Sequence, residues 1–198
     1  MLVCIIGMSA SGKDTLANEI CKDDRNIHLC VSHTTRPMRL NEVDGESYYF
    51  VTNDEFLQMK EDNLFLEDRT YKVANGELWR YGLSLQELHK HKNSIAIVDL
   101  NGYIEIKNKF KSQDIYSVYL NTNDDIRYSR YLKRLGEYPN KDELAELKRR
   151  IIQDTLDMPI SKVLDSVDIV LASNTDSDLE FNKYIINKIF MWRGRGLW

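Results

Sequence analysis

The sequence predicts an α/β protein with a doubly wound, parallel core of five strands, a small mixed α/β lobe inserted into that core, and a helical lid. Five short apolar runs are rich in β-branched or aromatic residues, and each is too short to be a buried helix. Helical patterns lie between most of these runs, which is the alternation expected of a parallel sheet with right-handed crossovers. The interval 32–92 breaks this alternation and therefore predicts an insertion.

The predicted elements follow one another along a single domain. The strands are Leu2–Ile6, Ile27–Val31, Ser94–Leu100, Ile115–Leu120 and Val167–Ala172. The helices are Thr15–Lys22, Tyr103–Phe110, Asp124–Leu135, Lys141–Asp157 and Asp178–Met191. We expect the core to comprise residues 1–31, 93–123 and 158–191, with the lobe at 32–92, the lid at 124–157 and a tail at 192–198.

The inserted lobe has local signals of its own. An extended run, Ser47–Val51, is followed by Thr52 and, three residues later, Glu55, which is the capping-box pattern that opens a helix. Farther on, Asn75 and Gly76 form the dipeptide most typical of a tight hairpin turn. These signals predict a short helix and a hairpin within the lobe.

Composition limits the partners and the compartment. The chain has 198 residues, 42% of them hydrophobic, which is enough for one sizeable core. A net charge of −4 argues against a nucleic-acid partner, and no apolar stretch approaches the length of a membrane span. The cysteines, Cys4, Cys21 and Cys30, lack metal-ligand spacing and predict reduced side chains. We expect a cytoplasmic protein without a membrane partner, either a monomer or a weak homodimer.

A phosphate loop is predicted directly after the first strand. The run GMSASGK, from Gly7 to Lys13, fits the pattern G-x-x-x-x-G-K and lies between a strand and a helix, as the motif requires. In such a loop the backbone N–H groups point at phosphate oxygens, and the lysine reaches the β- and γ-phosphates. The residues expected to contact ATP are Gly7, Ser9, Ala10, Ser11, Gly12, Lys13, Asp14 and Thr15.

The residue after the lysine departs from the usual pattern. Serine or threonine normally stands there and offers its hydroxyl to Mg²⁺, whereas this chain has Asp14 followed by Thr15. A carboxylate also suits a hard cation. Direct ligation by Asp14, a water-mediated contact, ligation by Thr15 and a plain helix-capping role all remain open.

A second anion site is predicted after the second strand. Arg36 and Arg39 lie three residues apart beside hydroxyl groups, and two arginines can clamp one phosphate through bidentate hydrogen bonds. Tyr48 can add another donor. Such a site suits an acceptor that already carries a phosphate, although the two arginines alone also fit a solvated loop.

The chain resembles the guanylate kinase family from Leu2 to about Phe190. The most specific segment is S-x-T-T-R-x-x-R-x-x-E-V-x-G-x-x-Y-x-F-V, which runs here from Ser32 to Val51. The resemblance implies a P-loop core, an inserted monophosphate-binding lobe and a mobile lid. It also implies transfer of the γ-phosphoryl group of ATP to GMP or dGMP, with Mg²⁺ as cofactor.

The resemblance assigns residues to the acceptor. Arg36, Arg39, Tyr48 and Tyr81 are expected to hold its phosphate. Glu67 is expected to accept hydrogen bonds from the guanine N1–H and N2–H₂ groups. The family pattern Y-G-[TS] reads Tyr81-Gly82-Leu83-Ser84 here, so the hydroxyl comes one residue late and other purine monophosphates stay open. The full predicted acceptor set is Ser32, Arg36, Arg39, Glu42, Tyr48, Glu67, Tyr81, Ser84 and Asp99.

Asp99 ends the third predicted strand. A carboxylate at this end of a parallel strand lies in the crevice where α/β sheets bind ligands. By resemblance to the family's D-x-x-G segment, here one residue shorter or shifted, Asp99 is expected near the phosphates and Mg²⁺. The predicted metal ligands are thus Asp14, after the phosphate-loop lysine, and Asp99. A local cap for the next helix is the alternative interpretation of Asp99.

Arginines are concentrated in the predicted lid. Arg127, Arg130 and Arg134 share one helical face, which usually means a solvated charged surface. Phosphoryl transfer requires charge neutralisation and exclusion of water, and a closing arginine lid provides both. By resemblance, the catalytic set is Lys13, Arg130, Arg134 and, with Arg149 as its alternative, Arg150. Asn174 is expected near the adenine ring.

Two other functions remain open at this point. One is a related P-loop kinase that acts on a different nucleoside monophosphate or on a phosphorylated sugar. The other is a guanylate-kinase-like interaction module without catalysis. Retention of Lys13 and of the lid arginines favours an enzyme.

Overall fold

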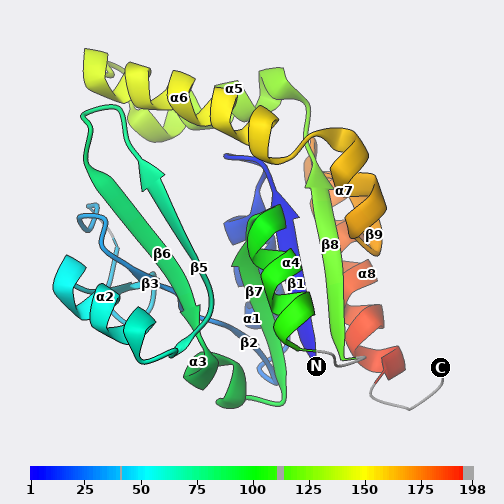
Figure 1. Ribbon diagram of the computed structural model, residues 1–198. Helices are drawn as coiled ribbons and strands as arrows, with labels where there is room; N and C mark the ends of the chain where they lie inside the picture. The colour runs from blue at the N-terminus through cyan, green and yellow to red at the C-terminus, as the bar shows by residue number, and fades with distance from the viewer. Residues whose placement is uncertain (41, 111–113, 194–198) are drawn as a thin grey trace.

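The computed structural model describes residues 1–40, 42–110 and 114–193, so most of the predicted tail lies outside the described residues. Its core is a sheet of five parallel strands in the order β2-β7-β1-β8-β9 (Figure 1). The strands are β1 (Leu2–Gly7), β2 (Ile27–Leu29), β7 (Asn93–Val98), β8 (Ile115–Asn121) and β9 (Ile169–Ala172). The predicted doubly wound fold is confirmed.

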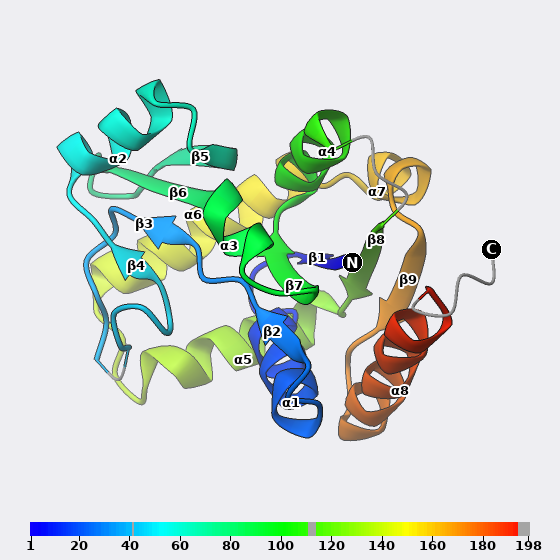
Figure 2. The same cartoon turned by 90° about the horizontal axis from the view of Figure 1, so that it is seen from below.

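Helices cover both faces of this sheet (Figure 2). On one face lie α1 (Lys13–Asp23) and α8 (Asp176–Arg193), packed with Val3 and Ile5. On the other face lie α4 (Leu100–Lys109) and α7 (Ile160–Ser166), packed with Cys4 and Ile6. Because successive residues of a strand point to opposite faces, the continuous apolar run of β1 supplies both halves of the core.

The inserted lobe contains a second, mixed sheet with the order β4-β3-β6-β5. Its elements are β3 (His33–Thr34), β4 (Tyr49–Phe50), α2 (Asn53–Glu61), β5 (Phe65–Lys72), β6 (Leu78–Ser84) and α3 (Leu85–His89). The predicted capping box at Thr52 and Glu55 is present. Gly76 has a φ of 89°, in the turn that joins β5 to β6, so the predicted hairpin is also confirmed.

Two helices, α5 (Asp124–Leu135) and α6 (Lys141–Asp157), extend across the carboxyl ends of the core strands toward the β5–β6 hairpin (Figure 1). The backbone N–H of Ala74, in that hairpin, donates a hydrogen bond of 3.1 Å to Glu146 of α6. The lid and the lobe are therefore in contact at the β5–β6 hairpin. Among the described residues, no helix combines the length and apolar character needed to cross a membrane.

Some predicted boundaries differ from the structure. The strand predicted to reach Leu100 ends at Val98, because the Asp99 side chain accepts a 2.6 Å hydrogen bond from Gly102 N and caps α4 there. The short helices α3 and α7 were not predicted, since five and seven residues are too few to show a helical period.

Candidate active site

A cavity of about 550 Å³ lies between the core, the lobe and the lid. It is lined by predicted site residues from the phosphate loop, from the lobe, and from the rest of the core and the lid. These are Gly7, Ser9, Ala10, Lys13 and Asp14 from the phosphate loop; Ser32, Arg36, Arg39, Glu42, Tyr48, Glu67 and Tyr81 from the lobe; and Asp99, Arg134 and Arg150 from the core and lid. The structure therefore brings the predicted phosphate site and the predicted acceptor site together.

The remaining predicted residues do not line this cavity: Ser11, Gly12, Thr15, Ser84, Arg130 and Asn174. Arg130 lies across the phosphate loop, where its Nη1 donates to the carbonyls of Ser11 (3.3 Å) and Ser173 (3.0 Å). Asn174 accepts from the backbone N–H of Asn123 through its side chain, beside the start of α5. Of the two, Arg130 contacts the phosphate loop and Asn174 contacts the start of α5.

Ser84 is positioned differently from the prediction. Its hydroxyl accepts a hydrogen bond from Glu87 N and caps α3 at the end of β6. Leu83, whose place in the family pattern carries a hydroxyl, is fully buried in the core beneath the lobe. Hence neither residue presents a hydroxyl to the cavity, and the acceptor-binding role predicted for Ser84 has no support in its position.

The phosphate loop has the backbone shape that its glycines allow. Gly12 has a φ of 97°, a left-handed conformation that favours glycine, and Ala10 also has a positive φ of 59°. Lys13 begins α1, and its Nζ donates to the carbonyls of Gly7 (2.8 Å) and Met8 (3.0 Å). Burial lowers the pKa of Lys13, so the ammonium carries a desolvation cost that a bound anion would relieve.

Glu42 holds the loop that carries the two arginines predicted to bind the acceptor phosphate. Arg36 is 4% exposed and makes two hydrogen bonds to Glu42, of 2.9 and 2.8 Å. Glu42 also accepts from the backbone N–H of Arg39 at 2.7 Å. The Arg36 guanidinium lies 5.4 Å from the centre of the Tyr48 ring. Glu42 therefore orients the arginine loop, whereas Arg36 and Arg39 supply the positive charge.

Glu67 is a buried carboxyl group at the deep end of the lobe. It is 6% exposed, and its Oε1 accepts a 3.2 Å hydrogen bond from Leu83 N. Burial, with Asp99 nearby, raises the pKa of Glu67 to about 8, although Arg69 opposes that shift. A carboxyl with such a pKa binds a pair of hydrogen-bond donors well only after it has lost its proton.

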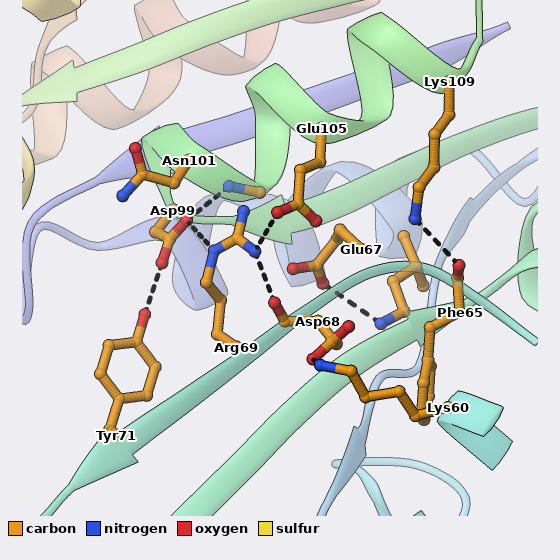
Figure 3. A network of polar contacts seen from close by, with 12 residues as sticks. Lys60, Phe65, Glu67, Asp68, Arg69, Tyr71, Asp99, Asn101, Glu105 and Lys109 are labelled. Atoms are coloured by element: carbon orange, nitrogen blue, oxygen red, sulfur yellow. Dashed lines mark hydrogen bonds and ion pairs between the residues drawn. The ribbon is translucent and has the colours of Figure 1, made fainter. Parts of the chain in front are cut away.

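Two residues beside Glu67 were not predicted. Arg69 and Tyr71 project from β5 on the same side as Glu67, toward the start of α4 (Figure 3). Arg69 Nε donates to Asp99 Oδ1 at 3.3 Å, and the Tyr71 hydroxyl makes a short hydrogen bond to Asp99 Oδ2. Since residues at i, i+2 and i+4 of a strand share one face, alternation along β5 could have identified this group. Asp99 thus caps α4 and also anchors β5.

The lid arginines are oriented by Glu146. Arg150 Nε and Arg149 Nε each donate to Glu146 at 2.8 Å. Although burial opposes the shift, hydrogen bonds from Arg149 and Arg150 lower the pKa of Glu146 to about 2. Arg134 reaches the same cavity from α5. A strongly ionised Glu146 therefore holds two guanidinium groups over the cleft and contacts the lobe at Ala74.

A further pair that was not predicted binds the phosphate loop itself. Arg127 of α5 donates from Nε to the carbonyl of Ser9 at 2.9 Å. Asp154 of α6 accepts from Ser9 N at 2.7 Å and pairs with Arg127 Nη2 at the same distance. Arg127 was expected only as part of a helical arginine face, and no local pattern marks Asp154, which is 27 residues away from it.

Comparison with known proteins agrees with this geometry. A family model described as guanylate kinase matches residues 1–174. The guanylate kinase of Helicobacter hepaticus is 35% identical over 157 residues, which cover 77% of this chain and 73% of that protein. The guanylate kinase of Prochlorococcus marinus is 31% identical over 166 residues, which cover 83% of this chain and 85% of that protein.

The fold has solved counterparts as well. The crystal structure of guanylate kinase from Anaplasma phagocytophilum superposes with a TM-score of 0.63 and 21% sequence identity. The match covers 98% of this chain and 85% of that chain, and it shows a similar fold. Membership of a family follows from the family model, which matches residues 1–174, and from the two relatives, which are 35% and 31% identical over 77% and 83% of this chain. The chain belongs to the guanylate kinase family.

Proposed function

We propose that this protein transfers the γ-phosphoryl group of ATP to GMP or dGMP, giving ADP and GDP or dGDP. The observation that carries the proposal is the shared cavity. Lys13 of the phosphate loop, Arg36 and Arg39 of the lobe and the buried carboxyl of Glu67 all line it. These groups match the triphosphate, the acceptor phosphate and the donor edge of guanine respectively.

The chemistry requires positioning and charge stabilisation more than proton transfer. A phosphate oxygen of the acceptor is already an anionic nucleophile, so no general base is needed. Arg36 and Arg39 would align that oxygen with the γ-phosphorus atom, since bidentate guanidinium contacts fix orientation. Lys13, Arg134 and Arg150 would stabilise the charge that spreads over the transferred group, and the lid would exclude water.

Mg²⁺ fits the donor set at the phosphate loop. Asp14 is exposed and lines the cavity directly after Lys13. Within the described ranges, no group of three or more acidic, histidine or cysteine side chains could hold a metal alone. Mg²⁺ in phosphoryl-transfer sites is usually held by one or two carboxylates together with substrate phosphates. Asp14 would hold Mg²⁺ with the triphosphate, where the ion supplies charge neutralisation. Both oxygens of Asp99 already accept hydrogen bonds, so Asp14 is the better placed of the two predicted ligands.

A direct test of the proposal is product identification. Purified protein given Mg·ATP and GMP is expected to form ADP and GDP in equal amounts, and to form neither product when GMP is omitted. Chromatography of the nucleotides measures both products. ADP formed without GDP, or no ADP with any monophosphate, would refute the transfer reaction.

Arg39→Ala is expected to raise the KM for GMP by about ten- to a hundred-and-fiftyfold, because hydrogen bonds to charged groups contribute roughly 1.5–3 kcal/mol. ATP affinity should change little, since Arg39 belongs to the lobe. Steady-state kinetics and isothermal titration with each nucleotide separate these effects. Loss of ATP binding with retained GMP binding would show that the two sites are assigned in reverse.

The pH dependence follows from Glu67. Its ionised form is the one that can accept hydrogen bonds from guanine N1–H and N2–H₂, and burial raises the pKa of this carboxyl to about 8. We therefore expect kcat/KM for GMP to rise with pH up to about 8 and then level off. The Glu67→Gln variant should lack this rise. If kcat/KM of the wild type for GMP, measured at saturating ATP, does not change between pH 6 and 9, ionisation of Glu67 does not control GMP binding.

A further inference from the structure

The Asp154 carboxylate accepts a hydrogen bond from a backbone N–H of the phosphate loop. Its Oδ2 accepts from the backbone N–H of Ser9 at 2.7 Å, and its Oδ1 accepts from the Ser9 hydroxyl at 3.2 Å. Both Ser9 and Asp154 line the main cavity. A carboxylate oxygen and a phosphate oxygen are the same class of anionic acceptor, so a carboxylate bound to a phosphate-loop N–H takes a place that suits a phosphate oxygen.

Ser9 lies at the end of the loop where a γ-phosphate would be expected. The α- and β-phosphates in a P-loop lie against the start of the following helix, here at Gly12 and Lys13, and the lysine extends to the γ-phosphate. Ser9 is on the opposite limb of the loop, after β1. Asp154 reaches it from α6, one helical turn after Arg150, which also faces the cavity. This end of the loop therefore contacts the lid helices.

We propose that Asp154 determines the discrimination between ATP and ADP, because its carboxylate must leave Ser9 when a γ-phosphate enters. ADP has no phosphate for that position and leaves the contact intact. The inference rests on the proposed function, since it assumes that the loop binds these two nucleotides. The Asp154 carboxylate competes with the γ-phosphate for Ser9 N and so weakens ATP binding relative to ADP binding.

Arg127 keeps an anionic partner when the γ-phosphate replaces the Asp154 carboxylate at Ser9. Arg127 is 4% exposed, and its guanidinium contacts Asp154, Asp124 and the Ser9 carbonyl together. When the γ-phosphate displaces Asp154, Arg127 faces a new anion in place of the old one. It also keeps Asp124 as a counter-ion at 2.7 Å. A buried cation thus has a partner both before and after ATP binds.

Asp154→Asn tests the inference because it removes the charge and retains the shape. The asparagine oxygen can still accept from Ser9 N, and Arg127 still has Asp124, so we expect the variant to fold. Isothermal titration with the Mg²⁺ complex of β,γ-imido-ATP should show about three- to tenfold tighter binding than in the wild type, because the γ-phosphate then displaces a neutral hydrogen bond at Ser9 N in place of a charged one about twice as strong. The Kd for Mg·ADP should change less than about twofold.

Three further variants sharpen the comparison. Asp142→Asn makes the same charge change in the first turn of α6, where Asp142 is exposed, and should change neither Kd. Asp154→Glu keeps the charge and should keep the wild-type ratio of the Kd for the ATP analogue to the Kd for Mg·ADP. Asp154→Ala should lower that ratio as Asp154→Asn does, so the result does not depend on one side chain.

The ratio of the two Kd values decides the outcome. If Asp154→Asn weakens both nucleotides equally, or leaves the ratio unchanged, Asp154 supports the loop and the inference is wrong while the proposed function stands. If the wild-type protein binds neither nucleotide, the proposed function and this inference fall together. Only a lower ratio in the two uncharged variants, with the Asp154→Glu ratio unchanged, supports the assignment.

Discussion

Replacement of Lys13 by methionine is expected to lower kcat by about a hundred- to a thousandfold, the usual loss when one preorganised charge-stabilising donor is removed. Lys13 is at the first position of α1, and its ammonium contacts the Gly7 and Met8 carbonyls, where it can turn toward phosphate oxygens. Methionine keeps most of the side-chain volume and removes the charge. Steady-state kinetics with saturating ATP and GMP measure the change.

The same substitution should not unfold the protein. Burial lowers the pKa of Lys13, which means that the folded state disfavours its charged form, so loss of the charge should leave the thermal midpoint unchanged or raise it. Lys22→Met, at the exposed end of α1, is the matched control and should keep full activity. Near-normal turnover by a folded Lys13→Met variant would contradict the phosphate-loop assignment.

Glu67→Gln is expected to reduce kcat/KM for GMP by about ten- to a hundred-and-fiftyfold, because hydrogen bonds to charged groups are worth roughly 1.5–3 kcal/mol. The substitution exchanges one acceptor oxygen for an NH₂ donor, which then faces a donor of the guanine base. AMP presents an acceptor at N1 and should lose little activity or gain some. Kinetics with GMP, dGMP and AMP as acceptors test this difference.

Controls can separate base recognition from a structural role. Glu67 is buried with a pKa raised to about 8, so its ionisation costs stability as the pH rises above the range of a free carboxyl. Glu67→Gln should therefore be more stable than the wild type at pH 8 to 9. Glu61→Gln, on the exposed end of α2 in the same lobe, should leave the kinetics unchanged. Equal losses for GMP and AMP would mean that Glu67 supports the lobe without recognising the base.

The features that could be predicted from the sequence are the ones that local patterns encode. The phosphate loop between β1 and α1, the capping box at Thr52 and the turn at Gly76 each depend on a few neighbouring residues, and each is present. The apolar runs likewise marked all five core strands, because strands buried on both faces are apolar throughout.

Other parts of the site depend on contacts that local patterns do not reveal. Ser84 was expected at the acceptor; it is one residue beyond the family position, it does not line the cavity, and at the end of β6 its hydroxyl caps α3. The pair of Arg127 and Asp154 joins two lid helices to the loop across a long sequence separation, which no local pattern reveals. Arg69 and Tyr71 could have been inferred from their alternation with Glu67 on β5. Their pairing with Asp99, itself a predicted site residue, could not be inferred, because no local pattern joins β5 to the start of α4.

The most direct test of the account compares nucleoside monophosphates as acceptors. A coupled assay of ADP release, with saturating Mg·ATP, gives kcat/KM for GMP, dGMP, AMP, CMP, UMP and phosphorylated sugars. We expect GMP and dGMP to exceed every other acceptor by at least about tenfold, since Glu67 can pair with two guanine donors and the others lack that pair. A higher kcat/KM for any acceptor without guanine, or no activity with any of them, would contradict the account.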